Sequence, residues 1–600
     1  MRLRAGQHDP LRRRAAVLLA VLVVVVLLTL AAYQYSDWMM AETRASASYT
    51  RSAQAQALAD SGVNYAAAVL SSPDAITTTL NGNPFNNPTA FSGIQVSDGS
   101  STQGRPGRFS IVSLVSPDAA NAGSQPYNFG VTDEAGKINL NAILALDKGQ
   151  GNVGKQMLMA IPGMTDEASD AILDWLDSDD TPRQSGAESD YYGSQSPPYQ
   201  AKNGPLDSLE ELLLVKGVTP QLLFGNDTNR NGVLDPGEDD GSGQSTQGWS
   251  AYLTVYSREP NVDSTGNPRV YLNDSDLNTL SSNLTSLNLS QDVVNFILAA
   301  RMYGLQTGGG GAGGGAPGGA GAGAAMPAAG GAAGGGKSMT GASDPGGGAA
   351  AGASAGGAGV AMSASNRTSV MSQITSDRSR GGMSSAGAGG GAMAAGGGAG
   401  GGAGGGGSGG GGGSKISSIW DLVNGSVNVP TTSGRATQNI SMPSPLKDPS
   451  AQQQYLPTLL DKTTTSQKAD LSPRINVNTA GVTVLQALQA AIPSLQDTDI
   501  QSIQQNQPDY SSSAAPDAIY QTPAWLLTQA NLSPSTLKSL DPYITARTGV
   551  YRMQVQGYFD NGTASRVEAV IDTNNGRPRV VYSRNLSELG KGFDLSQSGN

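Results

Sequence analysis

Lys137-Ile-Asn-Leu-Asn141 is a short segment that recurs twice later in the chain, as Arg269-Val-Tyr-Leu-Asn273 and Arg474-Ile-Asn-Val-Asn478. Each copy starts with a basic residue, alternates apolar and polar side chains and ends in Asn, which is typical of a short strand. A segment with helical spacing follows each copy, at 161–172, 287–297 and 492–503, and then a capped apolar element at 207–212, 417–422 and 521–526. Three elements in the same order indicate one module used three times. Chance similarity among short helical motifs is the alternative.

The repeats predict where the modules begin and end. We expect the first at 133–260, the second at 261–465 and the third at 466–548. Residues 307–414 interrupt the second module and are almost entirely Gly, Ala and Ser. Because this segment has too little apolar side-chain area to offset the entropy of ordering its backbone, we expect a disordered insert.

A twelve-residue loop late in the first module has the spacing of an EF-hand calcium site. It reads Asp227-Thr-Asn229-Arg-Asn231-Gly232-Val233-Leu-Asp235-Pro-Gly-Glu238. Oxygen-bearing side chains stand at positions 1, 3, 5, 9 and 12, with Gly at 6 for the sharp turn and the Val233 carbonyl at 7. We therefore predict Ca²⁺ bound by Asp227, Asn229, Asn231, Val233, Asp235 and Glu238. An Asx-rich surface turn without a metal is the alternative.

Composition limits the classes of function. The net charge is −11 and the chain contains no Cys and a single His, His8. Without Cys there are neither disulfides nor thiolate metal sites, and without another His the common catalytic arrangements are missing from the body of the protein. The acidic run Asp174, Asp177, Asp179 and Asp180 is more typical of a solvated cap or a second metal site than of a catalytic centre. We do not expect an enzyme.

The amino-terminal region predicts one long helix that crosses a membrane. Arg12, Arg13 and Arg14 precede an apolar run from Ala15 to Ala32, which at 1.5 Å per residue is just long enough to span a bilayer core. Helical spacing of apolar residues continues to Leu70, so we expect a retained single-pass anchor over 16–70 rather than a cleaved secretory signal. The arginines place the amino terminus in the cytoplasm and the bulk of the chain outside the inner membrane.

This arrangement resembles the type IV pilin and pseudopilin class, whose members carry a short basic leader that is cut just before an apolar helix. The resemblance implies a leader over 1–15, cut by a prepilin peptidase between Ala15 and Ala16, although Gly is the usual residue before the cut. Most members also have Glu as the fifth mature residue, where this chain has Ala20. The missing Glu is characteristic of the minor pseudopilin K of type II secretion.

The first module resembles the secretion protein K family. The motifs follow the family's order over Asp133–Asn141, Leu173–Asp180, Gly186–Glu188, Tyr191–Tyr192, Pro198–Tyr199, Asn203–Leu206 and Leu209–Leu212. The resemblance implies an α+β protein with an amino-terminal transmembrane helix and a pilin-like β-domain that contains inserted helical modules of helix-hairpin-helix or SAM-like type. It also implies a place at the tip of the pseudopilus, together with other minor pseudopilins, in support of protein export.

Strands on both sides of the modules are expected to form one sheet. The carboxyl-terminal region 549–600 alternates at period two over 549–559, 564–572 and 578–583, with Asn-Gly turns between. These strands can join 108–114 and 127–131, within the β region predicted at 71–132. The β-domain would then close around the modules.

A second reading remains open, in which the protein binds or takes up DNA through membrane-anchored helix-hairpin-helix units. Such units clamp phosphates with free backbone N–H groups and basic side chains. Here the turn Pro162–Met164 leads into carboxylates, at Asp166, Glu167, Asp170, Asp174 and Asp177. Because carboxylates repel phosphate, a scaffold role is favoured and no nucleic-acid partner is expected.

Overall fold

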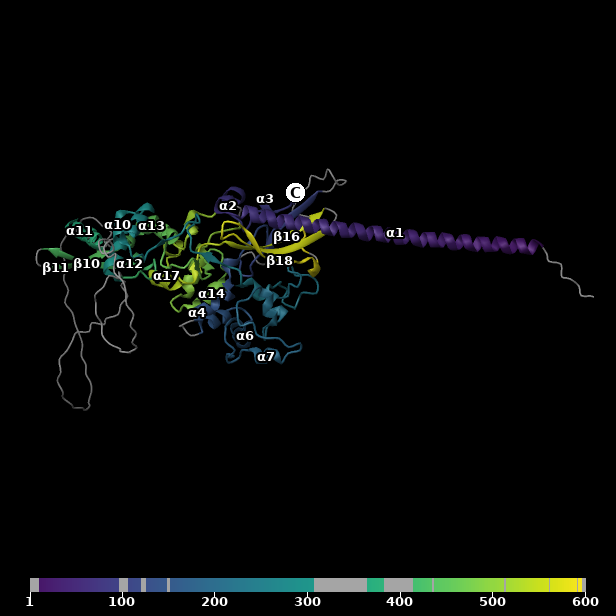
Figure 1. Ribbon diagram of the computed structural model, residues 1–600, viewed down its shortest axis with the longest axis horizontal. Coiled ribbons are helices and arrows are strands. Elements are labelled where there is room, and N and C mark those ends of the chain that lie inside the picture. The colour runs from purple at the N-terminus through teal and green to yellow at the C-terminus, as the bar shows by residue number, and fades with distance from the viewer. Residues whose placement is uncertain are drawn as a thin grey trace, which may run out of the picture. The chain divides into compact units, whose positions relative to one another are not determined.

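The computed structural model describes residues 10–96, 106–119, 126–147, 152–306, 364–381, 414–433, 436–511, 514–559, 562–590 and 592–595. These residues belong to two compact units (Figure 1). The first unit comprises Met1–Leu272, Ser418–Trp420 and Gln453–Asn600, and the second comprises Asn273–Ser417 and Asp421–Gln452. Residues 1–9 of the predicted leader lie outside the described residues.

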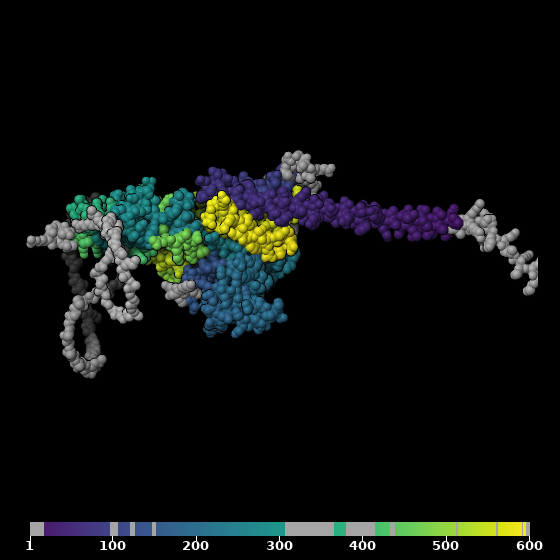
Figure 2. Space-filling model, viewed as in Figure 1, coloured from purple at the N-terminus to yellow at the C-terminus, as the bar shows by residue number. Residues whose placement is uncertain are grey.

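The longest element is the helix α1, Pro10–Val69. Residues 17–54 are exposed throughout, and Figure 2 shows this purple part projecting from the remainder of the first unit. Burial begins at Ala55 and continues with Leu58, Ala59 and Val63 at helical spacing. The exposed part is long and apolar enough to cross a membrane once, as the sequence predicts.

One antiparallel sheet joins the two ends of the first unit. Its strands lie in the order β1–β2–β16–β17–β18, and the short strands β3 and β4 pair with β2 and β16. The bounds are Ile94–Gln95, Gly107–Leu114, Val550–Phe559, Ala564–Asp572 and Arg579–Asn585, with β3 at Tyr127–Asn128 and β4 at Thr132–Asp133. Val555 of β16 lies opposite Ile111 of β2. The predicted union of amino-terminal and carboxyl-terminal strands is confirmed.

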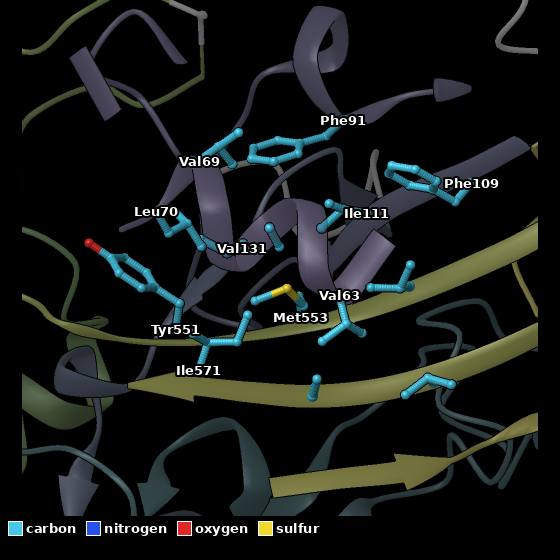
Figure 3. Packing of buried hydrophobic residues seen from close by; sticks show 14 of the residues in the cluster. Val63, Val69, Leu70, Phe91, Phe109, Ile111, Val131, Tyr551, Met553 and Ile571 are labelled. Carbon is cyan, nitrogen blue, oxygen red and sulfur yellow. The ribbon is translucent and has the colours of Figure 1, made fainter. Parts of the chain in front are cut away.

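The apolar face of this sheet packs against the end of α1 (Figure 3). Val63, Val69 and Leu70 from the helix meet Met553 of β16 and Ile571 of β17. Helices α2, Pro73–Leu80, and α3, Pro88–Phe91, follow α1 and each starts with Pro behind a capping side chain. Alternation along the strands supplies this face, since successive side chains point to opposite sides.

Each predicted module contains a short parallel ladder between a strand in its repeated segment and a strand near its end. β5, Ile138–Asn139, pairs with β6, Leu253–Thr254; β8, Val270–Tyr271, with β12, Thr463–Thr464; and β14, Ile475–Asn476, with β15, Ile544–Thr545. The Asn that ends each repeated segment donates its side-chain N–H to a backbone carbonyl at the start of the third element. The three pairs are Asn141 to Leu206, Asn273 to Ile416 and Asn478 to Tyr520. The recurring Asn therefore has one structural task, holding two distant segments of a module together.

The remaining elements of the first unit are short helices and the two short strands β7 and β13. Thr165 caps α6, because its hydroxyl accepts the N–H of Ala168. The bounds of these remaining elements are η1 Glu134–Gly136, α4 Leu140–Asp147, α5 Val153–Met159, α6 Asp166–Leu176, α7 Ser189–Gly193, η2 Leu209–Leu214, α8 Pro220–Phe224, η3 Gly248–Ala251, β7 Glu259–Pro260, β13 Asp470–Leu471, α14 Val482–Ala491, α15 Asp497–Asn506, η5 Ala518–Gln521, α16 Trp525–Thr528, α17 Pro534–Leu540 and η6 Ser587–Leu589. Helix α13, Pro449–Lys462, begins in the second unit and ends in the first.

The second unit contains a three-stranded sheet, β11–β10–β9, and helices packed on it. The bounds are α9 Leu277–Ser286, α10 Gln291–Tyr303, β9 Leu305–Gln306, α11 Ala364–Gly381, α12 Asp421–Asn424, β10 Ser426–Ser433, β11 Ala436–Pro443 and η4 Pro445–Lys447. Helix α11 corrects the prediction that 307–414 is disordered throughout. Its residues Val370 and Ile374 are four apart and buried, so this part of the insert does have an apolar face to pack.

Candidate metal site and its contact with the sheet

The loop 227–238 follows α8 and brings its predicted ligands together. Asn229 and Asn231 each donate a side-chain N–H to Oδ2 of Asp235, at 2.6 and 2.9 Å. Oδ1 of Asp227 accepts the backbone N–H of Asn231 at 3.0 Å. Positions 1, 3, 5 and 9 of the calcium template thus converge on one side of the loop.

Glu238, at position 12, closes the loop. Its Oε1 accepts the backbone N–H groups of Thr228 and Asn229, and its Oε2 accepts that of Asp235. The Val233 N–H donates to Oδ1 of Asn231, while the Val233 side chain is largely exposed. The predicted use of the Val233 carbonyl as a ligand stays a prediction.

Gly232 is needed at the centre of the loop for two reasons. Its φ is +75°, a conformation that L side chains rarely adopt. A Cβ there would also lie 2.7 Å from the carbonyl oxygen of Pro126 and 3.1 Å from Cδ2 of Leu114. The loop therefore turns directly against the end of strand β2.

The types of donor atom in the loop fit a hard cation. Three carboxylates and two amides supply oxygens, which are the atoms that calcium prefers. Burial raises the pKa of Asp227, and hydrogen bonds from the backbone of Gly232 and Asn231 oppose that rise. Among the described residues no cluster of three or more His, Cys, Asp or Glu side chains is arranged as a metal site. A metal site in this loop would therefore draw on the two Asn side chains as well as on the carboxylates.

Arginine side chains attach the loop to the polar face of the sheet. Arg566 of β17 donates to the backbone carbonyls of Asn229 and Arg230, and Gln554 of β16 donates to the carbonyl of Arg230 at 3.0 Å. The guanidinium of Arg230 in turn lies 3.3 Å from Glu568 and 3.9 Å from the centre of the Phe224 ring. The loop is thus held between the first module and strands β16 and β17.

A buried charge network continues from this contact. Arg552 of β16 pairs with Glu134 at 2.8 Å and with Glu568 at 3.0 Å. Burial alone would raise the pKa of Glu134, but Arg552 and Lys137 outweigh it and lower this pKa to about 2. A cavity of about 130 Å³ lies between the network and the loop. Sequence reasoning missed these residues, although the charges at alternate positions of one strand, Arg566 and Glu568, were a signal.

The acidic run of the first module stabilises a turn. Asp174 accepts the backbone N–H groups of Arg183 and Ala187 and pairs with the Arg183 side chain at 3.2 Å. Lys155 lies 3.0 Å from Asp166 and 2.9 Å from Asp170, and Lys216 lies 3.1 Å from Glu167. These cations offset much of the negative charge that the sequence places on α6.

Glu188 is an exception among these carboxylates. It is 3 % exposed, and neither of its carboxylate oxygens has a hydrogen-bond partner among the described residues. Burial, with the negative charges of Asp174 and Asp177, raises the pKa of Glu188 to about 7. Its carboxyl group is therefore partly protonated near neutral pH.

The predicted processing residues Ala15 and Ala16 lie inside α1. The backbone there is helical without a break into the exposed apolar segment that begins at Val17.

Comparison with known proteins identifies the first module. Residues 136–224 match the family described as "Type II secretion system (T2SS), protein K". This segment is similar to protein K of type II secretion systems. A putative type II secretion system protein K of Escherichia coli is 43 % identical over 60 residues, 10 % of this chain and 18 % of the relative. Type II secretion system protein K of Pseudomonas aeruginosa is 34 % identical over 93 residues, 14 % of this chain and 28 % of the relative.

The chain therefore spans less than a third of the length of either protein K relative. The resemblance to protein K that the motifs predict is confirmed. Among solved structures, the GspK–GspI–GspJ complex from the type 2 secretion system of enterotoxigenic Escherichia coli is similar, with a TM-score of 0.34 and 10 % identity over 92 % of this chain and 100 % of that chain. The reading as a DNA-binding or DNA-uptake protein is not favoured.

Proposed function

We propose that this protein is a minor pseudopilin of a type II secretion system. In that role it assembles at the tip of the periplasmic pseudopilus and supports export of folded proteins across the outer membrane. The observation that carries the proposal is a protein K segment in a chain whose long apolar helix runs directly into an antiparallel sheet. This combination supports a pilin-like β-domain with inserted helix-hairpin-helix or SAM-like modules.

The proposed location is the inner membrane, with the amino terminus in the cytoplasm and both units in the periplasm. Arg12, Arg13 and Arg14 support this orientation, since positive charge is retained on the cytoplasmic side. The partners are other minor pseudopilins and the prepilin peptidase. After cleavage between Ala15 and Ala16, the fifth residue is Ala20, which offers no carboxylate to a subunit above it. A terminal position follows, because α1 can still pack by its apolar surface on a subunit below.

The loop 227–238 is proposed to bind Ca²⁺ in the periplasm. Asp227, Asp235 and Glu238 supply the charge, Asn229 and Asn231 supply side-chain oxygens, and Val233 supplies its carbonyl. An Asn amide presents its oxygen after a half-turn of the same group, so the two amides now directed at Asp235 are suitably placed. The ion would stabilise the folded loop by mass action, because its protein ligands converge only in the folded state.

The test of the function uses the full chain in its host membrane. A strain that lacks the protein should lose export of a secreted enzyme and regain it with the intact chain. The tagged protein, extracted in detergent, should copurify other minor pseudopilins at one copy each, far below the major subunit. Normal export in the deletion strain, or equal stoichiometry with the major subunit, contradicts the proposal.

A further inference from the structure

Helix α11 differs in composition from the rest of the Gly-rich insert. The flanking segments 307–363 and 382–413 are almost entirely Gly, Ala and Ser, whereas α11 contains Arg367, Met371 and Asp377 together with two β-branched apolar residues. The described part of the insert therefore differs in chemistry from the segments that connect it.

Helix α11 lies on one face of the second unit. The helix packs against α9, α10 and strand β10. Val370 and Ile374 are 0 % and 2 % exposed, while residues 365–369 and Thr375 and Ser376 are exposed. One apolar stripe with i, i+4 spacing thus enters the face, which is the pattern of an amphipathic helix in a groove.

Polar contacts fix the register of α11 at the edge of this stripe. The Tyr303 hydroxyl donates to Oδ2 of Asp377 at 2.5 Å, and Arg378 donates to Oγ of Ser281 at 2.8 Å. At the other end Asn295 of α10 reaches the Met371 sulfur at 3.0 Å, and Arg367 lies 3.5 Å from Asp292. Contacts at both ends select one orientation of the helix.

Helix α11 has little reason to form by itself. Ser, Thr, Asn and Asp make up much of its sequence, and these residues are weak helix formers because their side chains compete for backbone groups. A single helix of this length and composition is marginal in water. Docking and helix formation are therefore coupled.

We propose that the α9–α10–β10 face is a binding site for an amphipathic helix and that α11 is its ligand, delivered in cis and released without unfolding of the unit. The ligand is recognised by apolar residues at two positions four apart and a carboxylate three residues further on, here Val370, Ile374 and Asp377. With only two buried anchors the free helix binds with a Kd on the order of 10–100 µM, and its covalent attachment to the unit, at an effective concentration on the order of 1 mM, keeps it mostly bound.

The first experiment empties the face. In a variant of the full chain, residues 307–413 are replaced by a short Gly-Ser linker, and a peptide of residues 364–381 is titrated in. Saturable binding is expected for this peptide and for its Thr375→Ala form, and no binding for its Ile374→Asp form. A variant that unfolds cooperatively yet binds no peptide overturns the proposal.

The second experiment measures release in the otherwise intact chain, which contains no Cys. Three single variants are alkylated: Ile374→Cys on the buried stripe, Ser376→Cys on the exposed side of α11, and Ile297→Cys in the core of α10. Ile374→Cys should react at least 10-fold more slowly than Ser376→Cys and at least 10-fold faster than Ile297→Cys. A rate equal to that of Ser376→Cys shows that α11 is not docked, and a rate equal to that of Ile297→Cys shows that it never leaves; either result overturns the proposal.

Discussion

The guanidinium of Arg230 lies 3.3 Å from the carboxylate of Glu568, so the fourth residue of the proposed calcium loop pairs with a strand near the other end of the chain. The backbone of the same loop accepts hydrogen bonds from Arg566 and Gln554. A substitution in the loop should therefore alter the contacts of β16 and β17, the strands whose opposite face packs against α1.

Replacing two ligands, Asp227→Ala with Glu238→Ala, should abolish stabilisation by calcium. At a calcium concentration 100 times the Kd, the intact protein gains about 2.7 kcal/mol from mass action alone. The melting temperatures of both proteins, with calcium and with chelator, give the comparison. Asp239→Ala with Asp240→Ala is the matched control, because it removes equal charge from exposed residues just after the loop. An intact protein that melts at the same temperature with calcium and chelator would refute the site.

Arg552→Ala should destabilise the first unit by about 3–5 kcal/mol, because it leaves the carboxylate of Glu134 buried without its main partner. Urea unfolding of the exported region measures the loss. Arg579→Ala serves as the control, since Arg579 is 56 % exposed and its pair with Asp572 should contribute about 0–1 kcal/mol. Equal losses of unfolding free energy for the two substitutions would show that the buried network contributes no more to stability than an exposed ion pair.

The stability of the metal-free protein should fall as pH rises through the range set by Glu188. The pKa of Glu188 is about 7 in the folded state, above the 4.5 that is usual for Glu, so the folded state binds more protons than the unfolded state between these values. In chelator, unfolding free energy should therefore decrease from about pH 5 to pH 8. Glu188→Gln should remove most of this slope and stabilise the protein at pH 8 by about 1–2 kcal/mol. An unchanged slope would assign the pH dependence to other groups, of which Asp174, with a pKa of about 6, is the next to test.

Asn478→Ala should cost about 2–4 kcal/mol. The side chain donates to the carbonyls of Tyr520 and Ala546 and accepts the indole N–H of Trp525, all in a buried site. Asn141→Ala removes the equivalent contact with Leu206 at an exposed position of the first module and should cost about 1 kcal/mol. Thermal unfolding of the two variants measures both losses of stability. Equal losses would mean that burial does not explain the larger cost expected for Asn478→Ala.

Processing should leave Ala16 as the first residue of the membrane-extracted protein. The basic leader and the apolar run directly behind Arg14 motivate this prediction. Amino-terminal sequencing decides it, and Ala15→Gly, which introduces the usual residue before the cut, should be processed at least as fast. A protein that starts at Met1, or near Ser36, would contradict cleavage at this site.

Local patterns in the sequence determined much of this protein. The apolar run of α1, the cap at Thr165 and the period-two strands each depend on neighbours a few residues away, so they are readable without a fold. The protein K motifs and the spacing of the loop 227–238 are also properties of short segments. Even the pairing of 108–114 with the carboxyl-terminal strands followed from unpaired strands at both ends.

Tertiary structure alone decided what covers each surface. Alternation in β16 is typical of a strand with a polar face toward solvent, yet Gln554 and Gln556 are buried. Gln554 donates to the carbonyl of Arg230 in the loop 227–238, more than 300 residues away, and Gln556 bonds the backbone of Phe593. Composition likewise predicts no order in the Gly-rich insert, and α11 is ordered because α9 and α10 offer a face for Val370 and Ile374. The free energy of burying a polar or a sparse apolar side chain depends on its partner, and that partner is absent from the local sequence.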